Sequence, residues 1–473
     1  MTTLGEELAE QSRWRARAKG DAAAYDALVA NEFDTPDAQV ARIAGPLRRL
    51  LRICARHVPF YRERFAELGL DPEARDPLET LSLLPVLLKG NVQEHAKALV
   101  AEVFAEPSDR IASSTVSSGT TGRPTRVYFS MDAWRMFGVL KQREYRWFRF
   151  DPAEKLVSIR LASQLSCKAD GSRLADGEML KHLAWGHVGS AFATGPHLHY
   201  NVTNPVDDQL RLLRKQNPRY LIGYPETLEH LAFAAAPESP VGSIRSVLAV
   251  SEQLTPGMRR FIARSFGAPI QQNYGLNEIG LVAVRCEAGR YHVHTEHCHV
   301  EILDAAGNPV ESGKAGRIVV TSLTNTAMPM VRYDTGDLAQ VIDGACPCGR
   351  TLPAFGEVVG RYSRIAFLPE GTLGLVGTLS SAVEEMPAEH ARGLRQIQIH
   401  QSRDQGFELR VVATGPLPQA FSRTVHAAWA RASADGDYPL AIVQVDEIPR
   451  SPGGKFQAFT SDFMPALKPD GGD

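Results

Sequence analysis

The sequence has few cysteines, almost no net charge and no long apolar run. Its 473 residues include six cysteines, and the formal net charge is -2. Basic and acidic residues are mixed along the chain, which argues against a nucleic-acid partner. No apolar run approaches the roughly 20 residues that span a bilayer, and the first residues lack the apolar core of a signal peptide. These absences predict a cytoplasmic protein without membrane contact.

The order of apolar and polar residues predicts an α/β protein. Up to about Ala105, apolar residues recur at spacings of three and four, which indicates a helical entry region. From Ile111 to about Gln340, short β-branched runs alternate with amphipathic stretches, which favours parallel strands crossed by helices. Within this part, residues 299–342 have the turn residues of paired strands, so we expect a β subdomain there.

A new strand and helix pattern begins after Gly360. It contains enough strand-like and helical runs for a small α+β domain of about a hundred residues. We therefore expect a large N-terminal domain over residues 1–360 and a small C-terminal domain over residues 361–473. The sequence does not distinguish a monomer from a homodimer.

A run of hydroxyl and glycine residues, SSTVSSGTTGRPT, extends from Ser113 to Thr125. Glycines let backbone N–H groups turn toward an anion, and hydroxyls donate to phosphate oxygens. The run suits a polyphosphate, although it lacks the G-x-x-x-x-G-K-[ST] pattern of an ordinary P-loop. It resembles the phosphate loop of adenylate-forming enzymes. The resemblance implies that ATP is held by Ser117, Ser118, Gly119, Thr120, Thr121 and Gly122.

Further segments follow in the order of that superfamily. Ser251 and Glu252 stand where the family places a turn against adenine. In QNYGLNE, the resemblance assigns Tyr274 to adenine stacking and Glu278 to holding magnesium. Asn277 replaces the usual Ser or Thr, which leaves the substrate less defined. The nucleotide and acyl contacts expected from this segment are Asn273, Tyr274, Gly275 and Asn277.

Two later segments complete the nucleotide site that the resemblance implies. In RYDTGD, Asp337 would accept both ribose hydroxyls, since two adjacent donors can share its two oxygens. Arg361 would meet phosphate. In PRSPGGK, Lys455 would bridge the substrate carboxylate and the α-phosphate, stabilising the charge that builds as pyrophosphate leaves. Lys455 and Glu278 are the expected catalytic residues, with ATP and Mg²⁺ as cofactors.

The motif matches run from Ser113 to Lys455. In addition, the N-terminal stretch VPFYRERFAELGL resembles the opening of phenylacetate-CoA ligase-like proteins. The chain is therefore identified as a member of the adenylate-forming superfamily, which includes acyl-CoA synthetases, in its phenylacetate-CoA ligase-like branch. The C-terminal domain of such enzymes is a mobile lid.

Four of the six cysteines lie in one stretch of the sequence, and three of them belong to two short groups of possible metal ligands. Cys346 and Cys348 are one residue apart, and Cys286 is followed by His292. In a reducing compartment these two pairs indicate structural Zn²⁺ of the Cys₃His type, and zinc-bearing members of the same branch have a similar arrangement. Strand alternation makes His294 the strongest rival ligand, because it shares a face with His292. The other rivals are His297, Cys298 and His299.

The resemblance implies that the large domain binds ATP-Mg and an acid, whose oxygen attacks the α-phosphorus to give an acyl-adenylate and pyrophosphate. The lid then rotates, and the thiol of CoA or of a carrier protein displaces AMP. We expect an aromatic or arylacetic carboxylate. Its pocket would be lined by Trp134, Phe137, Tyr224 and Pro225, residues that equally suit a core.

After the hinge the sequence departs from the family pattern. Ser363 replaces an acidic residue, and the glycine loop beside the pantetheine tunnel is unrecognisable. Adenylation is therefore better supported than transfer to CoA. One alternative is a non-thiol acceptor, as in amide ligases, synthetases that adenylate a phenol-type hydroxyl, or nitrite-activating diazotases of secondary metabolism acting on an aryl amine. Another is a catalytically silent nucleotide-binding protein.

Overall fold

The computed structural model forms two compact units, which we describe separately. Unit 1 comprises residues 1–153, 183–195 and 272–359, and unit 2 comprises residues 154–182, 196–271 and 360–473. The structure describes residues 21–104, 111–116, 126–186, 194–235, 241–252, 254–304, 306–361, 383, 386–387, 389–402, 406–432, 438–449 and 459–462.

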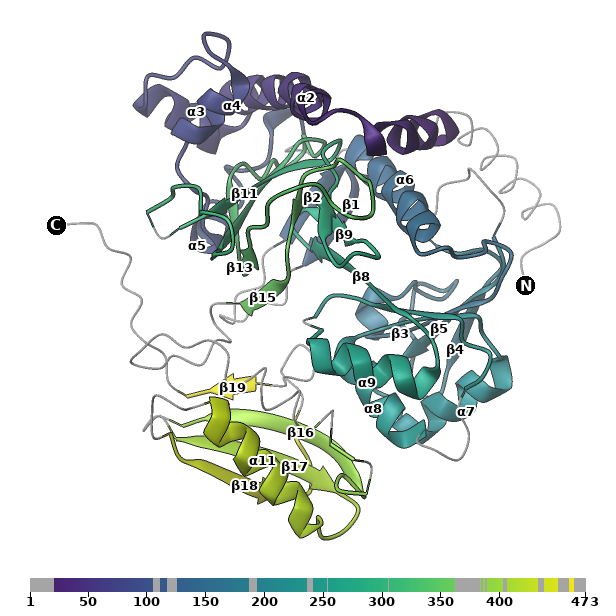
Figure 1. Ribbon diagram of the computed structural model, residues 1–473. Coiled ribbons are helices and arrows are strands. Elements are labelled where there is room, and N and C mark those ends of the chain that lie inside the picture. Colours follow the sequence, from purple (N-terminus) through teal and green to yellow (C-terminus); the bar gives the residue numbers. More distant parts are fainter. Residues whose placement is uncertain are drawn as a thin grey trace. The chain divides into compact units, whose positions relative to one another are not determined.

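Helices dominate the start of unit 1, as the sequence predicts (Figure 1). Helix α2 (Pro36–His57) begins at Thr35, whose hydroxyl accepts the N–H of Ala38, with a proline in the first turn. Its buried apolar residues recur at spacings of three and four: Ile43, Leu47, Leu50, Leu51 and Cys54. Shorter elements surround it: η1 (Asn31–Phe33), α3 (Pro59–Glu67), α4 (Pro77–Leu83), α5 (Lys89–Glu94) and η2 (Glu102–Phe104).

A strand pair leads into the long helix α6 (Met131–Trp147). Strands β1 (Ile111–Val116) and β2 (Arg126–Ser130) are antiparallel. The Ser130 hydroxyl caps α6 by accepting the N–H of Ala133, and the Ser130 N–H donates to Asn325 Oδ1 at 3.1 Å. The start of α6 is thus fixed to a distant part of unit 1.

The strands that carry the QNYGLNE motif are antiparallel, which corrects the prediction of parallel strands up to Gln340. Strand β8 (Ile270–Leu276) pairs with β9 (Gly280–Arg285), β9 pairs with β10 (Tyr291–Val293), and β10 pairs with β14 (Ala354–Phe355). Only a few residues connect β8 to β9, and a parallel crossover needs about a dozen. The short connection therefore imposes a hairpin.

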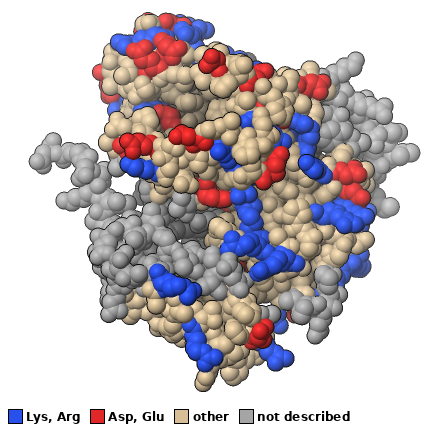
Figure 2. Space-filling model, viewed as in Figure 1, with Lys and Arg blue, Asp and Glu red and all other residues tan. Residues whose placement is uncertain are grey.

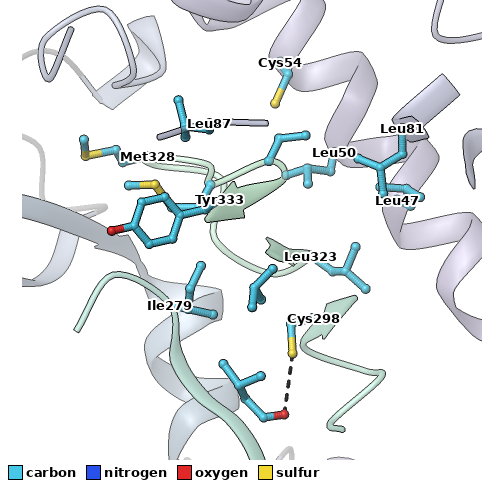
Figure 3. Close-up of a cluster of buried hydrophobic side chains, with 14 of the residues drawn as sticks. Leu47, Leu50, Cys54, Leu81, Leu87, Ile279, Cys298, Leu323, Met328 and Tyr333 are labelled. Carbon is cyan, nitrogen blue, oxygen red and sulfur yellow. Dashed lines mark hydrogen bonds between the residues drawn. The ribbon is translucent and has the colours of Figure 1, made fainter. Parts of the chain in front are cut away.

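The predicted β subdomain is present. Strands β11 (Cys298–Leu303), β12 (Ala315–Ser322), β13 (Tyr333–Gln340) and β15 (Val358–Arg361) form a four-stranded sheet in that order. Its apolar residues share one core with the N-terminal helices. Figure 3 shows Leu50 and Cys54 of α2 in the same cluster as Tyr333 of β13. Burial of this shared core holds β13 beside the helical region.

Unit 2 contains the parallel strands that the sequence predicts. Strands β3 (Leu156–Arg160), β5 (His197–Asn201), β6 (Tyr220–Gly223) and β7 (Ser246–Ala249) are parallel, and β4 (Met179–His182) is antiparallel to β5. Helices α7 (Val206–Gln216) and α8 (Pro225–Ala235) connect successive strands, α9 (Pro256–Phe266) follows β7, and η3 (Ala162–Gln164) follows β3. This alternation confirms the α/β class.

The C-terminal part of unit 2 forms the predicted small α+β fold. Strands β16 (Leu394–Gln401), β17 (Phe407–Ala413), β18 (Leu440–Gln444) and β19 (Phe459–Ser461) form one sheet, with helix α11 (Gln419–Ala432) in the same segment. The chain passes from unit 1 to this part at Val359/Gly360. Domain ranges of 1–360 and 361–473 stay a prediction.

The described surface carries charges of both signs. On the face drawn in Figure 2, acidic and basic side chains are interspersed among the coloured residues. Within the described ranges, no helix combines the length and apolar character needed to cross a membrane.

Candidate active site and metal centre

Two predicted nucleotide-binding segments of unit 1 are joined by two hydrogen bonds. The Tyr274 hydroxyl on β8 donates to Asp337 Oδ2 on β13 at 2.8 Å. The Tyr333 hydroxyl on β13 donates to Glu278 Oε1, just after β8, at 3.4 Å. Tyr274 and Asp337 are 63 positions apart in the sequence. The structure therefore brings the predicted adenine, ribose and magnesium residues of unit 1 together.

The turn before Asp337 is held by its own side chains. The Asp337 N–H donates to Thr335 Oγ1 at 3.1 Å, and the Gly336 N–H donates to Asp334 Oδ1 at 2.9 Å. Gly336 has a φ of +74°, a conformation that glycine adopts without steric cost. These hydrogen bonds fix the backbone of Asp337. They also explain locally why Thr and Gly precede Asp337 in the T-G-D motif.

The predicted phosphate-loop residues Ser117, Ser118, Gly119, Thr120, Thr121 and Gly122 lie outside the described residues, as does Lys455. Their roles stay predictions. The strand that enters this loop is described, however. Thr115 Oγ1 donates to the carbonyl oxygen of Asn277 at 2.7 Å. The approach to the loop is thereby joined to the QNYGLNE segment.

The hairpin of β8 and β9 is too close for a side chain at Gly275. A Cβ atom at this position would lie 2.8 Å from the carbonyl oxygen of Gly280. A Cβ atom on Gly280 would lie 3.7 Å from a ring carbon of Phe137. The Phe137 ring stacks on that of Trp134, with 6.1 Å between centroids. Two predicted pocket residues of α6 thus form one aromatic pair, and Phe137 lies beside the motif.

Asn273 faces the opposite end of the same helix. Its Nδ2 donates to Glu144 Oε2 on α6 at 2.8 Å, and Glu144 Oε1 accepts from Lys141 in a buried ion pair. Both charged residues are buried. Sequence reasoning did not identify this pair, because helical spacing alone does not show which polar residues face inward.

In unit 2, predicted residues lie at the carboxyl ends of the parallel strands. The Tyr224 hydroxyl, after β6, donates to Gln164 Oε1 at 2.6 Å and accepts the Leu161 N–H at 3.2 Å. Ser251, after β7, has a φ of +67°, and its hydroxyl accepts from Arg160 at 3.3 Å. Ligands of open α/β sheets bind at this edge. The local placement therefore suits a nucleotide or acid site.

The other predicted residues of unit 2 are less informative. Pro225 is the first residue of α8, and Glu252 directly follows Ser251. Arg361 is the last residue of β15, and its side chain is not described. Burial raises the pKa of Tyr224, so that its hydroxyl stays neutral and can donate to Gln164. Tyr224 is 2% exposed, which also suits a core role.

Tyr333 and Arg332 are functional candidates that sequence reasoning missed. Arg332 has a φ of +49°, forms an ion pair with Glu301 at 2.9 Å and donates to the carbonyl oxygens of Ser82 and Leu84. These contacts connect the helical entry region to the residue that precedes Tyr333. The adjacent hydroxyl of Tyr333 then reaches Glu278. The only sequence signal that could have identified Arg332 and Tyr333 was their position directly before the D-T-G-D segment.

The four predicted metal ligands lie together in unit 1. One ligand atom from each of Cys286, His292, Cys346 and Cys348 lies within 4.8 Å of the other three. The Cys286 and Cys346 sulfurs are 3.6 Å apart, and the Cys348 sulfur is 3.3 Å from His292 Nε2. Zinc bonds of about 2.0 to 2.3 Å in a tetrahedron separate ligand atoms by roughly 3.5 to 3.8 Å. The two short separations are close to these values, and the others are at most 4.8 Å, so small shifts of the side chains would close all four around one cation.

Hydrogen bonds prepare these side chains for a metal. His292 Nδ1 donates to the carbonyl oxygen of Leu352 at 2.9 Å, which leaves Nε2 directed at the cysteines. Burial lowers the pKa of His292 and keeps its ring neutral. Burial disfavours the Cys348 thiolate, yet hydrogen bonds from the Arg350 backbone and the Cys346 side chain lower its pKa overall. Burial raises the pKa of the Cys346 thiol to about 12, so a cation would have to displace its proton.

The rival ligands have other contacts. His294 Nδ1 is hydrogen-bonded to the buried Arg143. His297 Nδ1 pairs with Thr324 Oγ1 at 2.7 Å, and its Nε2 donates to the carbonyl oxygen of Ile279 at 3.0 Å. Cys298 donates to a backbone carbonyl, drawn as the dashed line in Figure 3. Among the described residues, the only group of three or more potential ligands is the predicted set.

Comparisons with known proteins agree with this geometry. Residues 68–328 match the family model of AMP-binding enzymes. A phenylacetate-coenzyme A ligase of Thermus thermophilus is 30% identical over 334 residues, which cover 67% of this chain and 68% of the relative. A phenylacetate-coenzyme A ligase of Escherichia coli is 24% identical, with 67% of this chain and 69% of the relative covered.

A solved structure supports the same fold. The crystal structure of a 2-hydroxyisobutyryl-CoA ligase in the postadenylation state superposes with a TM-score of 0.73, 20% identity and 91% coverage of both chains. Because the family model spans more than half of the sequence, the chain belongs to the AMP-binding enzyme family, as an adenylate-forming, AMP-forming ligase of the phenylacetate-CoA ligase-like branch.

Proposed function

We propose that the protein uses ATP to adenylate an aromatic or arylacetic carboxylate and then transfers the acyl group to the thiol of CoA. The observation that carries the proposal is the pair of hydrogen bonds from Tyr274 to Asp337 and from Tyr333 to Glu278. They support the proposal because they join the segment of Asp337, the proposed ribose acceptor, to the segment of Glu278, the proposed magnesium ligand. The relatives named as phenylacetate-coenzyme A ligases support the aromatic acid.

In the first half-reaction, a carboxylate oxygen of the acid attacks the α-phosphorus of ATP. The bond from this phosphorus to the bridging oxygen breaks, and pyrophosphate leaves. Asp337 would hold the ribose hydroxyls, and Lys455 would neutralise charge on the α-phosphate. The placement of Glu278 suits a magnesium contact, because Tyr333 occupies Oε1 and leaves Oε2 for the cation. Magnesium would supply positive charge against the phosphates.

In the second half-reaction, the sulfur of CoA attacks the acyl carbon, the bond from that carbon to the AMP oxygen breaks, and the thiol proton is lost to solvent. We assign this step to CoA because the family relatives are CoA ligases. Zinc in the Cys₃His cluster would be structural, since four protein ligands leave no open position for a substrate. The cytoplasmic location and the monomeric or homodimeric state rest on the sequence alone.

The test is a screen for AMP formation with purified protein, ATP and Mg²⁺. Benzoates, phenylacetates and nitrite would each be supplied alone, with CoA, or with an aryl amine. We expect AMP with an aromatic acid and CoA, together with the acyl thioester. If AMP forms only when an aryl amine is present, the acceptor is an amine and not the thiol of CoA. No AMP from any combination would favour a silent nucleotide-binding protein.

A further inference from the structure

One face of helix α6 changes from aromatic to charged along its length. Trp134, Phe137, Lys141 and Glu144 follow one another at spacings of three or four, so they share a face of the helix. Trp134 is 38% exposed, Phe137 is partly buried, Lys141 is 9% exposed and Glu144 is fully buried. The face therefore runs from the surface into the interior of unit 1, beside β8 and β9.

The charged end of this face contacts the motif strand. Asn273 lies two residues before Gly275 on β8, and its Nδ2 donates to Glu144 Oε2 at 2.8 Å. The other oxygen of Glu144 accepts from Lys141. Phe137 lies beside Gly280, which pairs with the Gly275 end of β8. Aromatic and polar residues thus line the same hairpin, with Asn273 at the inner end.

This arrangement fixes which way the amide of Asn273 points. A carboxylate accepts hydrogen bonds but cannot donate them, so the NH₂ group of Asn273 must face Glu144. The carbonyl oxygen Oδ1 is then directed away from Glu144, and Asn273 is only partly buried. The second oxygen of Glu144 is held by the buried contact with Lys141. The amide oxygen of Asn273 is therefore an acceptor that does not face Glu144.

A purely apolar acid would gain nothing from such an acceptor. A buried polar group without a partner costs about 1 to 3 kcal/mol. A donor on the substrate would satisfy the acceptor, and Glu144 and Lys141 would act only as positioning residues. A phenylacetate-like acid without a substituent would leave Asn273 Oδ1 unpaired when water is excluded.

We propose that the acid is an aromatic carboxylate whose ring carries a hydrogen-bond donor, an amino or hydroxyl group, and that Asn273 recognises this group. The inference rests on the proposed function, because it takes the α6 and β8 surface as part of the acid site. It makes Asn273 the specificity-determining residue, while Glu144 fixes its orientation.

The experiment measures kcat/KM for acid-dependent pyrophosphate exchange with benzoate, the ring isomers of aminobenzoate and hydroxybenzoate, and the matching methylbenzoates. A methyl group has about the same size as the donor groups but cannot donate. We expect the full-length enzyme to prefer one donor-bearing isomer over its methyl analogue by about 100-fold. Asn273→Leu should reduce this ratio to within a few-fold of one, chiefly through loss of rate with the donor-bearing acid.

Three further variants keep the test decisive. Glu144→Gln should relax the preference, because a glutamine can also donate and the Asn273 amide is then free to turn. Asn308→Leu makes the same change on an exposed turn and should leave the ratio unchanged. If Asn273→Leu does not fold, Asn273→Ser gives a smaller change at the same position.

The outcomes separate the inference from the proposed function. Equal rates for donor-bearing and methyl acids, or a preference that survives Asn273→Leu in folded protein, would overturn the inference and leave adenylation intact. No exchange with any aromatic acid would instead overturn the proposed function.

Discussion

The hydrogen bond from Tyr274 holds the carboxylate of Asp337, which we propose as the acceptor for the ribose hydroxyls. Both side chains are buried, at 8% and 6% exposure, and the bond between them is 2.8 Å long. A hydrogen bond to a charged group is worth about 1.5 to 3 kcal/mol. Tyr274 therefore has two roles in the proposed site: its ring stacks on adenine, and its hydroxyl holds Asp337.

Replacing Tyr274 by Phe separates these roles. The ring stays, but Asp337 loses the hydrogen bond from Tyr274, so we expect ATP to bind about tenfold more weakly, equivalent to about 1.4 kcal/mol. Isothermal titration with ATP-Mg measures this change. Tyr200→Phe removes a hydroxyl from a buried tyrosine of β5 and serves as the control. Equal affinity of Tyr274→Phe and wild type would show that the hydroxyl does not support the nucleotide site.

His297 couples stability to pH. Burial lowers its pKa to about 4, whereas an unfolded histidine titrates at about 6.5. Between these values the unfolded chain binds more protons, so this contribution to stability is complete above about pH 6.5 and falls as the pH drops toward 4. His297→Gln removes the titrating group and should destabilise the protein at neutral pH.

Comparing wild type with His297→Gln isolates the contribution of His297 to the pH dependence of stability. From about pH 6.5 to about pH 5, the variant should lose about 2 kcal/mol less unfolding free energy than wild type. Urea denaturation of both proteins at both pH values measures this difference. Any acid-labile metal binding at the cysteine cluster would be common to both proteins and would cancel. Parallel losses in the two proteins would mean that His297 is not held neutral.

At the scale of elements, the sequence predicted whether a segment is a helix or a strand better than it predicted which strands pair and in which direction. The alternation of apolar runs and amphipathic stretches correctly indicated β6 and β7 with α8 and α9. It did not show that β8 reverses into β9, because apolar content is similar in parallel and antiparallel strands. The connection length between the two strands was the usable signal.

Contacts between distant elements were beyond sequence reasoning. Arg332 donates to the carbonyl oxygens of Ser82 and Leu84, some 250 positions away, and nothing in either segment identifies the other. The buried pair of Lys141 and Glu144 was likewise hidden in a helix whose polar residues resemble those of a solvated face. By contrast, the proximity of Cys286, His292, Cys346 and Cys348 was predictable, because short Cys and His spacings restrict geometry directly. Their role as metal ligands stays a prediction.

The cysteine cluster should stabilise the segment that connects β9, β10 and β14. We expect about one zinc per chain in the purified protein. Cys346→Ser combined with Cys348→Ser should release the metal and lower the unfolding free energy by more than about 2 kcal/mol, because structural metal binding contributes directly to folding. Elemental analysis and thermal denaturation measure the two effects. Cys167→Ser, which changes an exposed thiol outside the cluster, is the control. A metal-free wild-type protein of normal stability would rule out the site.

At the scale of the whole molecule, the two proposed half-reactions make different demands on the C-terminal part. Residues 394–462 form their own sheet and helix, with a separate apolar core that includes Phe407 and Trp429. A segment with its own core can change position without losing its fold. Such movement would let one chain use Lys455 for adenylation and a different surface for thioester formation.

Lys455→Ala tests this division of labour. The lysine is proposed to act only while pyrophosphate leaves, so we expect acid-dependent pyrophosphate exchange to fall by at least about 100-fold, whereas ATP affinity changes little. Transfer from synthetic acyl-adenylate to CoA should continue at close to the wild-type rate, because the C-terminal part is proposed to present a different surface, without Lys455, during that step. Lys314→Ala removes an exposed lysine of unit 1 and controls for the loss of charge. If the rates of both half-reactions fell together, the lysine would be needed for the fold or for both positions of the C-terminal part. If neither rate fell, adenylation would depend on another cation.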